Sequence, residues 1–330
     1  MRILFAGSPA IAVPSLLRLE TSHEIVGVLT NPDAEKGRGK RVEPTDVAIA
    51  SESLSAGRVS RGLPPIPVLK PERLLAEARD AVAALKPDLL VVVAYGRIFG
   101  PKFLSLFPKG GINLHPSLLP KYRGCAPIPA AILNRDTETA VSVQRLALEM
   151  DSGDILGVEL IPLTGEETTE SLSAFVAERG AALVNSVVDS IAAGVVPAKV
   201  QDHGAASYCG MLRKEDGRLD WSRSALALDA RIRAFFPWPG AFTTHGAHKL
   251  NILDARPYAG PLFTSSSGAE AGTVLGVDKS SGILVQTGDG LLALRRLQYE
   301  TKKPLDWRSF LNGAHDFIGS HLGAEAHETL

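Results

Sequence analysis

Two polar side chains stand two residues apart in an otherwise apolar stretch of the chain. Asn113 and His115 alternate in the extended segment NLHPSLLP (113–120), and alternate residues of a strand point to the same face. Asp151 follows 36 positions after His115 and comes directly after Met150, where a carboxylate can be partly desolvated. An amide, an imidazole and a carboxylate can together stabilise an oxyanion and move a proton.

The loop after His115 has the composition of a ligand-binding loop. Pro116 and Pro120 stiffen it, and the backbone groups of Ser117–Leu119 can face a ligand. Lys121 and Arg123 are expected at its mouth. Each feature taken alone is common in loops without a function, but their combination beside a buried strand favours a functional site.

Two other kinds of site are less consistent with the same residues. His115 has no second His, Cys or Glu at the spacing of metal ligands, so we expect no metal. Cys125 could act with His115 and Asn113 as in a cysteine hydrolase, but no neighbour in the sequence would lower the pKa of its thiol. A small packing residue is the favoured interpretation of Cys125.

Short apolar runs alternate with helical patterns around the candidate site. We expect strands at 2–6, 24–30, 89–94, 112–114, 141–146 and 154–160, and helices at 72–85 and 171–193. This alternation predicts an α/β fold with a Rossmann-like, mostly parallel sheet and right-handed crossovers. Gly7-Ser8-Pro9 follows the first strand, where dinucleotide-binding proteins have G-x-G-x-x-G. Pro9 replaces the second glycine, so we expect a tight turn and no NAD.

The pattern changes near residue 194. We therefore divide the chain into a catalytic domain at 1–193, a linker at 194–210 and a second domain at 211–330. Beyond a helix at 224–236, turn residues separate strands expected at 241–244, 249–255, 272–277, 282–287 and 290–297, which favour a small antiparallel β-barrel. The aromatic residues in 233–243 are expected to pack in its core rather than to stack on bases.

Composition limits the class of protein. The 330 residues carry 35 Lys and Arg against 36 Asp and Glu, a formal net charge of −1, which excludes nucleic-acid binding through bulk charge. Two cysteines exclude a disulfide scaffold and fit a reducing compartment. The N-terminus lacks the pattern of a signal peptide, and the apolar run at 89–95 is too short to span a bilayer. We expect a cytoplasmic protein that makes no use of a membrane.

Taken together, these motifs resemble the folate-dependent formyltransferase superfamily, and within it the methionyl-tRNA formyltransferase family, over almost the whole chain. Asn113, His115 and Asp151 match its catalytic residues, and SLLP (117–120) matches its folate-binding loop. Three further stretches match the tRNA-specific family: GSPAIAVPSL (7–16), NPDAEKGRGKRVEPTDV (31–47) and RAFFPWPGAFT (233–243). Four positions depart from the family pattern without removing a catalytic group: Ser8, Pro116, Cys125 and Pro129.

The resemblance implies transfer of the formyl group of 10-formyltetrahydrofolate to the amino group of methionine on charged initiator tRNA, without a covalent enzyme intermediate or a metal. The reduced folate is expected at Ser117, Leu118, Leu119, Pro120, Ala94, Tyr95 and Gly96. Asn113 would donate to the oxyanion, His115 would supply a second hydrogen bond and a proton, and Asp151 would orient the imidazole and accept the amine proton.

The nucleic-acid side of the expected activity depends mainly on the resemblance. The family uses the basic loop at Lys36, Arg38, Lys40 and Arg41 against the acceptor stem, and an OB-like barrel as a tRNA-binding domain. We expect a monomer. The alternatives are a formyltransferase for an amino sugar or another small amine, a 10-formyltetrahydrofolate hydrolase, and an idle tRNA-binding module. The retained Asn113, His115 and Asp151 argue against the last.

Overall fold

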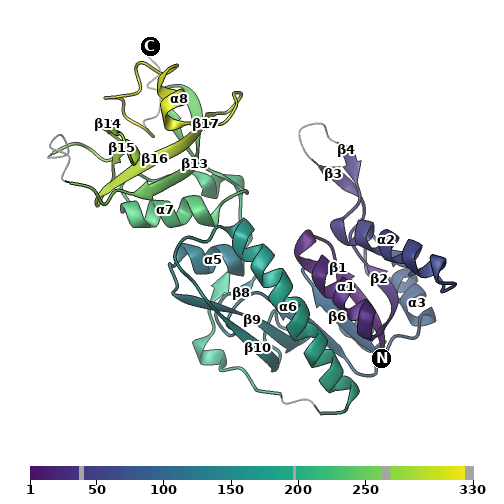
Figure 1. Ribbon diagram of the computed structural model, residues 1–330. Coiled ribbons are helices and arrows are strands. Elements are labelled where there is room, and N and C mark those ends of the chain that lie inside the picture. Colours follow the sequence, from purple (N-terminus) through teal and green to yellow (C-terminus); the bar gives the residue numbers. More distant parts are fainter. Residues whose placement is uncertain (37–40, 196–197, 262–267, 324–330) are drawn as a thin grey trace. The chain divides into compact units, whose positions relative to one another are not determined.

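The computed structural model describes residues 1–36, 41–195, 198–261 and 268–323 (Figure 1). It consists of two compact units. The first unit comprises Met1–Pro127, Glu138–Pro162 and Leu172–Gly210. The second comprises Ile128–Thr137, Leu163–Ser171 and Met211–Leu330. Residues 198–210, expected in a linker, therefore group with the first unit.

Within the described residues, a seven-stranded sheet of order β10-β9-β7-β6-β1-β2-β5 forms the centre of the first unit. Its strands are β1 (Arg2–Gly7), β2 (Glu24–Leu29), β5 (Val68–Leu69), β6 (Leu89–Val93), β7 (Gly111–His115), β9 (Glu138–Arg145) and β10 (Ile155–Pro162). The first five of these strands pair in parallel, whereas β9 runs antiparallel to both β7 and β10. The prediction of a mostly parallel α/β sheet is confirmed.

Helices connect the parallel strands, and two further helices, α6 and η2, follow the last strand of the sheet. They are η1 (Ala10–Ala12), α1 (Val13–Ser22), α2 (Asp46–Ser60), α3 (Ala76–Ala84), α4 (Pro101–Leu104), α6 (Thr169–Ala192) and η2 (His203–Ala205). The hydroxyl of Thr45 caps α2 by accepting from Ala48 N at 3.1 Å. The helix expected at 72–85 begins only at Ala76, because Leu75 has extended backbone angles.

Glycine allows α6 to lie close to the sheet. A Cβ atom on Gly180 would lie 2.8 Å from the Leu114 side chain on β7, so a larger residue would push the helix away. On the face of the sheet that carries Leu4 and Val92, apolar side chains pack with Val82 of α3. The aromatic rings of Tyr95, Phe99, Phe103 and Phe107 extend the same cluster.

The turn after β1 is as tight as expected. A Cβ atom on Gly7 would lie 2.8 Å from Val93 O and 2.9 Å from the Ala12 side chain, so only glycine fits there. The Ser8 hydroxyl accepts from Asn31 N at 3.2 Å, which links the ends of β1 and β2. The ends of neighbouring parallel strands thus lie together at one edge of the sheet, where open α/β sheets bind their ligands.

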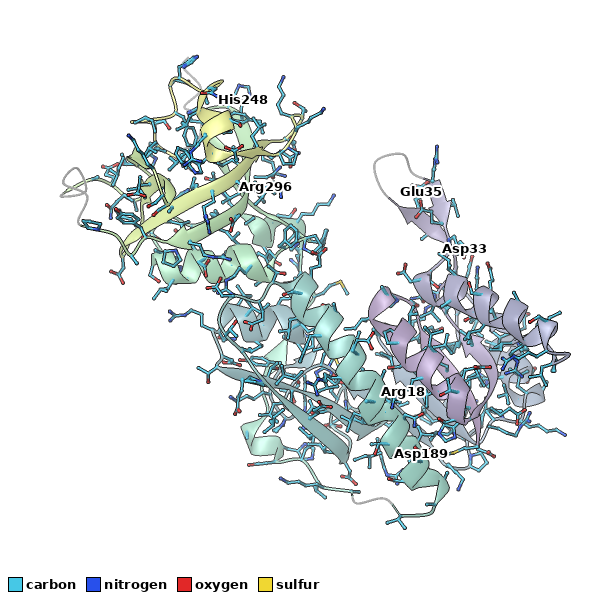
Figure 2. The ribbon with its side chains drawn as sticks, viewed as in Figure 1. Arg18, Asp33, Glu35, Asp189, His248 and Arg296 are labelled. Carbon is cyan, nitrogen blue, oxygen red and sulfur yellow. The ribbon has the colours of Figure 1, made fainter. Side chains whose placement is uncertain are left out.

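A short hairpin interrupts the connection between β2 and α2. Its strands β3 (Ala34–Lys36) and β4 (Arg41–Glu43) pair antiparallel, and the hairpin extends away from the sheet (Figure 1). Figure 2 labels Asp33 at its base and Glu35 on β3. The Lys70 ammonium lies 2.6 Å from Asp33 Oδ1 and anchors this base to the end of β5.

The second unit contains an antiparallel sheet of order β12-β13-β16-β15-β14, with β17 on β16, among the residues described. Its elements are α5 (Pro127–Leu133), η3 (Lys214–Gly217), α7 (Ala225–Ala234), β12 (Ala241–His245), β13 (His248–Pro257), β14 (Val274–Asp278), β15 (Gly282–Gln286), β16 (Leu291–Tyr299), β17 (Leu305–Asp306) and α8 (Trp307–Leu311). His321 bridges Thr273 just before β14, and Leu322 bridges His245 of β12, so the final described segment closes the sheet between its edges. The predicted second β domain is confirmed.

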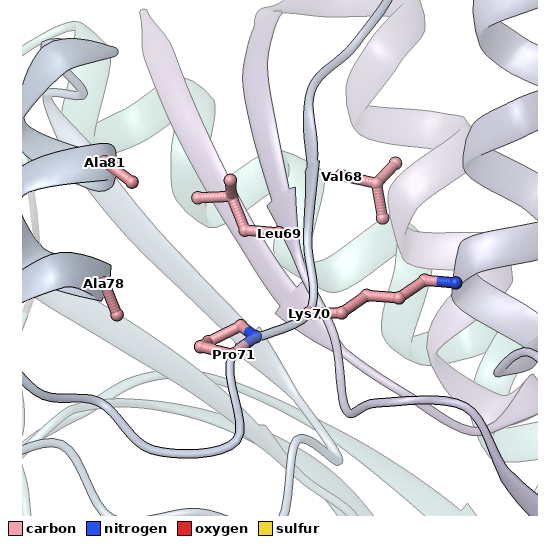
Figure 3. Close-up of a pocket in the computed structure, with 6 residues that line it drawn as sticks. All are labelled: Val68, Leu69, Lys70, Pro71, Ala78 and Ala81. Carbon is pink, nitrogen blue, oxygen red and sulfur yellow. The ribbon is translucent and has the colours of Figure 1, made fainter.

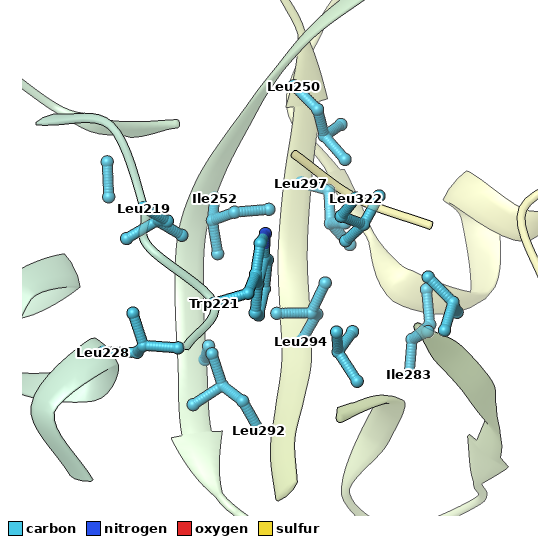
Figure 4. Close-up of a cluster of buried hydrophobic side chains, with 14 of the residues drawn as sticks. Leu219, Trp221, Leu228, Leu250, Ile252, Ile283, Leu292, Leu294, Leu297 and Leu322 are labelled. Atoms are coloured by element: carbon cyan, nitrogen blue, oxygen red, sulfur yellow. The ribbon is translucent and has the colours of Figure 1, made fainter. Parts of the chain in front are cut away.

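Buried apolar side chains of this second sheet and of the helices beside it form one hydrophobic core (Figure 4). Trp221 lies among them and donates its Nε1–H to Thr243 Oγ1 at 3.0 Å, so its polar atom is satisfied. Phe235 is buried, as expected, but Trp238 is 51% exposed. The expectation that the aromatic residues of 233–243 pack in the core is thus wrong for Trp238. None of the described helices combines the length and the apolar character needed to cross a bilayer.

Candidate active site

The register of two strands brings four polar side chains to one face of the sheet. Asn113 of β7 is the direct partner of Gln144 on β9, and His115 is the partner of Ser142. Cross-strand partners point to the same side. The alternation of Asn113 and His115 therefore continues in Gln144 and Ser142 of the neighbouring strand. The strand itself was expected, but these two residues were not expected in the site.

The carboxylate of Asp151 is the centre of this group. Its Oδ1 accepts from Gln144 Nε2 at 2.8 Å and from Asn113 Nδ2 at 3.4 Å. Its Oδ2 accepts from Gly124 N at 2.9 Å and lies 3.5 Å from His115 Nδ1. The structure thus brings Asn113, His115 and Asp151 together, and N–H donors satisfy both carboxylate oxygens.

Both ring nitrogens of the buried His115 face acceptors. Nε2 lies 2.8 Å from the Tyr122 carbonyl oxygen, and Nδ1 lies 3.5 Å from the Asp151 carboxylate. Neither partner can donate, so a ring with a proton on each nitrogen satisfies both. These two contacts fix the orientation of the imidazole ring.

The backbone at Asp151 has an uncommon conformation. Its φ is 52°, in the left-handed region that side chains other than glycine rarely adopt. Two residues later, a Cβ atom on Gly153 would lie 1.9 Å from the Arg145 carbonyl oxygen, so the turn presses against the end of β9. Such strain is characteristic of functional sites and must be held by surrounding contacts.

The loop expected to bind folate is fixed mainly by its own contacts. Ser117 and Leu119 are buried. The Ser117 hydroxyl donates to Lys121 O at 2.6 Å, and its carbonyl accepts from Ser142 Oγ at 2.7 Å. Leu118 and Pro120 are partly exposed and are the members of this loop that can contact a ligand.

The second group of expected folate residues follows β6 at the same edge of the sheet. Ala94 and Gly96 are exposed and have positive φ values of 49° and 79°. Tyr95 is buried between them, its carbonyl accepts from Asn31 Nδ2 at 3.1 Å, and burial raises the pKa of its hydroxyl. Of these three residues, Ala94 and Gly96 are therefore the two that a ligand can reach.

Two expectations about side-chain exposure are wrong. Arg123 does not lie at the mouth of the loop but is buried, because Gln201 and His203 replace the water around its guanidinium. Cys125 is exposed instead of packed. The other cysteine, Cys209, has a thiol whose pKa is raised by burial, which disfavours the thiolate.

Sequence reasoning missed the two glutamines of this site. Gln144 could have been found from its alternation with Ser142 on a predicted strand. Gln201 gave no local signal, because it lies in the aperiodic segment expected to be a linker. That segment forms β11 (Tyr208–Cys209), which pairs in parallel with β8 (Arg123–Gly124) and so ties the segment to the loop after β7.

Two of the four residues expected to contact nucleic acid, Lys36 and Arg41, fall on the β3–β4 hairpin. Lys36 and Arg41 are Cα partners across it, and Arg41 is exposed. Arg38 and Lys40 lie outside the described residues.

A cavity of about 200 Å³ lies apart from these residues (Figure 3). Its lining comprises Val68, Leu69, Lys70, Pro71, Ala78 and Ala81. Sites for drug-sized molecules have about 300–1,000 Å³, so this cavity is too small for a folate. Over the described ranges, no group of three His, Cys, Asp or Glu side chains is arranged to hold a metal ion.

Comparison with protein families identifies both units. Residues 1–188 match the formyl transferase family, and residues 211–315 match the formyl transferase C-terminal domain. The chain belongs to the formyl transferase family. Among relatives of this formyl transferase, a methionyl-tRNA formyltransferase from Treponema denticola is 46% identical over 96% of this chain and 98% of its own. One from Treponema pallidum is 47% identical over 98% and 99%.

Solved structures share the fold of this formyl transferase at low identity. HypX from Aquifex aeolicus has a TM-score of 0.63 and 16% identity, covering 96% of this chain and 50% of its own. The sugar 3N-formyl transferase WlaRD has a TM-score of 0.63 and 15% identity, with coverage of 92% and 99%. At such identities these likenesses concern the fold alone.

Proposed function

We propose that this formyl transferase carries the formyl group of 10-formyltetrahydrofolate to the α-amino group of methionine on charged initiator tRNA. The observation that carries the proposal is the convergence of Asn113, His115 and Asp151 at the sheet edge. Relatives named methionyl-tRNA formyltransferase, more than 40% identical over nearly the whole chain, support the choice of acceptor. The product is N-formylmethionyl-tRNA for translation initiation.

Asn113 stabilises the formyl oxygen as it gains negative charge. One N–H of its amide faces Asp151, which fixes the side chain, and the same nitrogen carries a second N–H for the oxyanion. Removal of one such donor costs about 3–4 kcal/mol in other acyl-transfer enzymes. The partly exposed position of Asn113 gives a substrate access to it.

His115 and Asp151 carry out the two proton transfers that the reaction requires. The attacking amine must lose a proton, and the leaving nitrogen of the folate must gain one. His115 donates, since both its nitrogens can hold protons between their acceptors. Asp151 stabilises the charged ring and accepts the amine proton directly or through a water molecule. No bond between enzyme and formyl carbon is needed.

The folate lies, in this proposal, along the edge where β6 and β7 end. The exposed backbone of Ala94 and Gly96 offers hydrogen bonds to a flat heterocycle, and Leu118 and Pro120 offer apolar contact. The buried Tyr95, Ser117 and Leu119 support these positions from behind. Leu148 and Met150, which are 71% and 53% exposed, add apolar surface next to Asp151.

The tRNA contacts two regions in this proposal. Phosphates of the acceptor stem meet the basic side chains of the segment 36–41, which are Lys36, Arg38, Lys40 and Arg41. The domain at 211–330 supplies a second contact surface, with the exposed Arg295 and Arg296 on β16 as candidates. We further propose a cytoplasmic monomer, since neither substrate requires a membrane or a second subunit.

One assay tests the proposal. Purified protein is incubated with 10-formyltetrahydrofolate and methionine-charged initiator tRNA, and formyl appearing on the aminoacyl group is followed. Uncharged tRNA and an Asn113→Ala variant serve as controls. We expect transfer that requires the charged tRNA and falls in the variant. Folate turnover without formylation of the tRNA would refute the proposed acceptor and indicate hydrolysis or a different amine.

A further inference from the structure

Gln201 reaches the site from a distant part of the chain and is buried there. Its Nε2 lies 2.9 Å from the Asp151 carbonyl oxygen, 2.6 Å from that of Gly153 and 3.2 Å from Gln144 Oε1. Its two N–H groups thus serve three acceptors. Two of these acceptors belong to the strained turn that carries the Asp151 carboxylate.

Arg123 determines which way the Gln201 amide points. Its Nε and Nη2 donate to Gln201 Oε1 at 3.2 and 2.7 Å. A guanidinium has only donors, so the oxygen of the amide must face it and the nitrogen must face the turn. The buried Arg123 therefore fixes the amide orientation that lets Gln201 hold the Asp151 turn.

The same constraint passes to the next amide. Gln201 donates to Gln144 Oε1, so the Gln144 nitrogen is directed at Asp151 Oδ1, 2.8 Å away. With Gln144 reversed, its oxygen would face the carboxylate and two acceptors would repel each other. The amides of Gln201 and Gln144 therefore each have one orientation that satisfies all the hydrogen bonds of the series that starts at the Arg123 guanidinium.

We propose that Gln201, oriented by Arg123, is a positioning residue that holds the Asp151 turn and directs the Gln144 N–H to the Asp151 carboxylate. It acts through other residues and does not touch the substrates. The inference depends on the proposed function only for its kinetic readout, because the orientation of the Gln144 amide can be measured without substrates.

The decisive variant is Gln201→Glu. A carboxylate still accepts from Arg123, which favours folding, but it cannot donate to Gln144 or to the two carbonyls of the turn. Displacement of a reacting group by about 1 Å can cost about 100-fold in rate, so we expect kcat to fall about 10- to 100-fold with each KM within about twofold. Protonation restores one donor, so the ratio of variant to wild-type kcat should rise as the pH is lowered.

Two further variants keep this test decisive. Gln201→Met preserves volume without hydrogen bonds and should lose kcat similarly, with no recovery at low pH. Asn185→Asp makes the same amide-to-carboxyl change on α6, where Nδ2 lies 2.9 Å from Asp189 Oδ2, and should leave kcat unchanged. If both Gln201 variants keep wild-type kcat, or if kcat and KM change together without pH dependence, the proposal is overturned.

A spectroscopic readout separates this inference from the proposed function. The chain has only four glutamines, so selective ¹⁵N labelling gives four side-chain amide signals. Gln201→Met should remove one signal and shift that of Gln144, while those of Gln286 and Gln298 stay. An unchanged Gln144 signal overturns the positioning role even if formyl transfer is normal. A shifted signal in a protein that does not formylate tRNA supports the positioning role and refutes the proposed function alone.

Discussion

Replacement of Asp151 by Asn is the most direct test of the proton-transfer role. The substitution keeps the shape of the side chain but removes its charge and one acceptor oxygen. If the remaining oxygen stays toward Gln144 and Asn113, the new NH₂ group meets the Gly124 N–H, which now lacks its acceptor at 2.9 Å. Loss of one hydrogen bond to a charged group costs about 1.5–3 kcal/mol of stability.

The expected loss of activity is larger than this structural cost. A positioned general base contributes about 10²–10⁴ in rate, which corresponds to about 2.7–5.4 kcal/mol of barrier. We therefore expect Asp151→Asn to retain folding and folate affinity but to lose about 10²–10⁴ in kcat. Single-turnover formyl transfer measures the rate, and isothermal titration measures folate binding.

A matched variant controls for the change of net charge. Asp80→Asn removes one carboxylate from the exposed surface of α3 and should leave both rate and folate affinity unchanged. The reasoning is refuted if Asp151→Asn weakens folate binding by the same factor as it lowers the rate. That result would make Asp151 a binding residue and would leave the proton acceptor unidentified.

Three further predictions concern stability and binding. Burial lowers the pKa of His23, whose Nε2 lies 3.1 Å from Asp189 Oδ1, so its contribution to stability is retained above its ordinary pKa of 6.5 and falls as the pH drops through that value. We expect calorimetry to show a smaller fall in Tm between pH 7.5 and 5.5 for His23→Gln than for the wild type, and an unaltered pH dependence would contradict this. Leu294→Ala in the core of the second unit should lower the free energy of unfolding in urea by about 2–5 kcal/mol, whereas Leu226→Ala at a 52% exposed helix position should lower it little. Equal losses would show that the core is misassigned. Arg41→Glu on the hairpin should weaken tRNA binding, leave folate binding unchanged, and lower the slope of log affinity against log salt by about one unit per lost phosphate contact. A slope equal to that of the wild type would argue against a phosphate contact.

The predictable part of this molecule is the part with local periodicity. The continuous apolar run at Leu89–Val93 is a strand buried on both faces, and the alternation of Asn113 with His115 places both beside Asp151. These features depend on residues near one another in sequence or on the fixed geometry of parallel strands. Pattern and structure therefore agree.

The rest depends on contacts between distant segments. Charged residues are rarely buried, so the expectation that Arg123 lies at the surface followed a sound general rule. It failed because Gln201, 78 positions away, supplies the acceptor for its guanidinium. The segment with Gln201 has no periodicity, since its backbone pairs with the two-residue strand β8 and not with a neighbour in sequence. From sequence alone, such a segment cannot be distinguished from a linker, because the strand with which it pairs is distant in the chain.

The origin of Gln201 bears on how the first unit is delimited. Four stretches separated in sequence hold the Asp151 carboxylate and its turn: β7 with Asn113, β8 with Gly124, β9 with Gln144, and the segment after α6 with Gln201. The last segment lies beyond residue 193, yet it groups with the first unit up to Gly210. The end of α6 therefore does not mark the end of the unit that positions the site. Because Arg123 orients the Gln201 amide, the loop after β7 and this segment both contribute to holding Asp151 as observed.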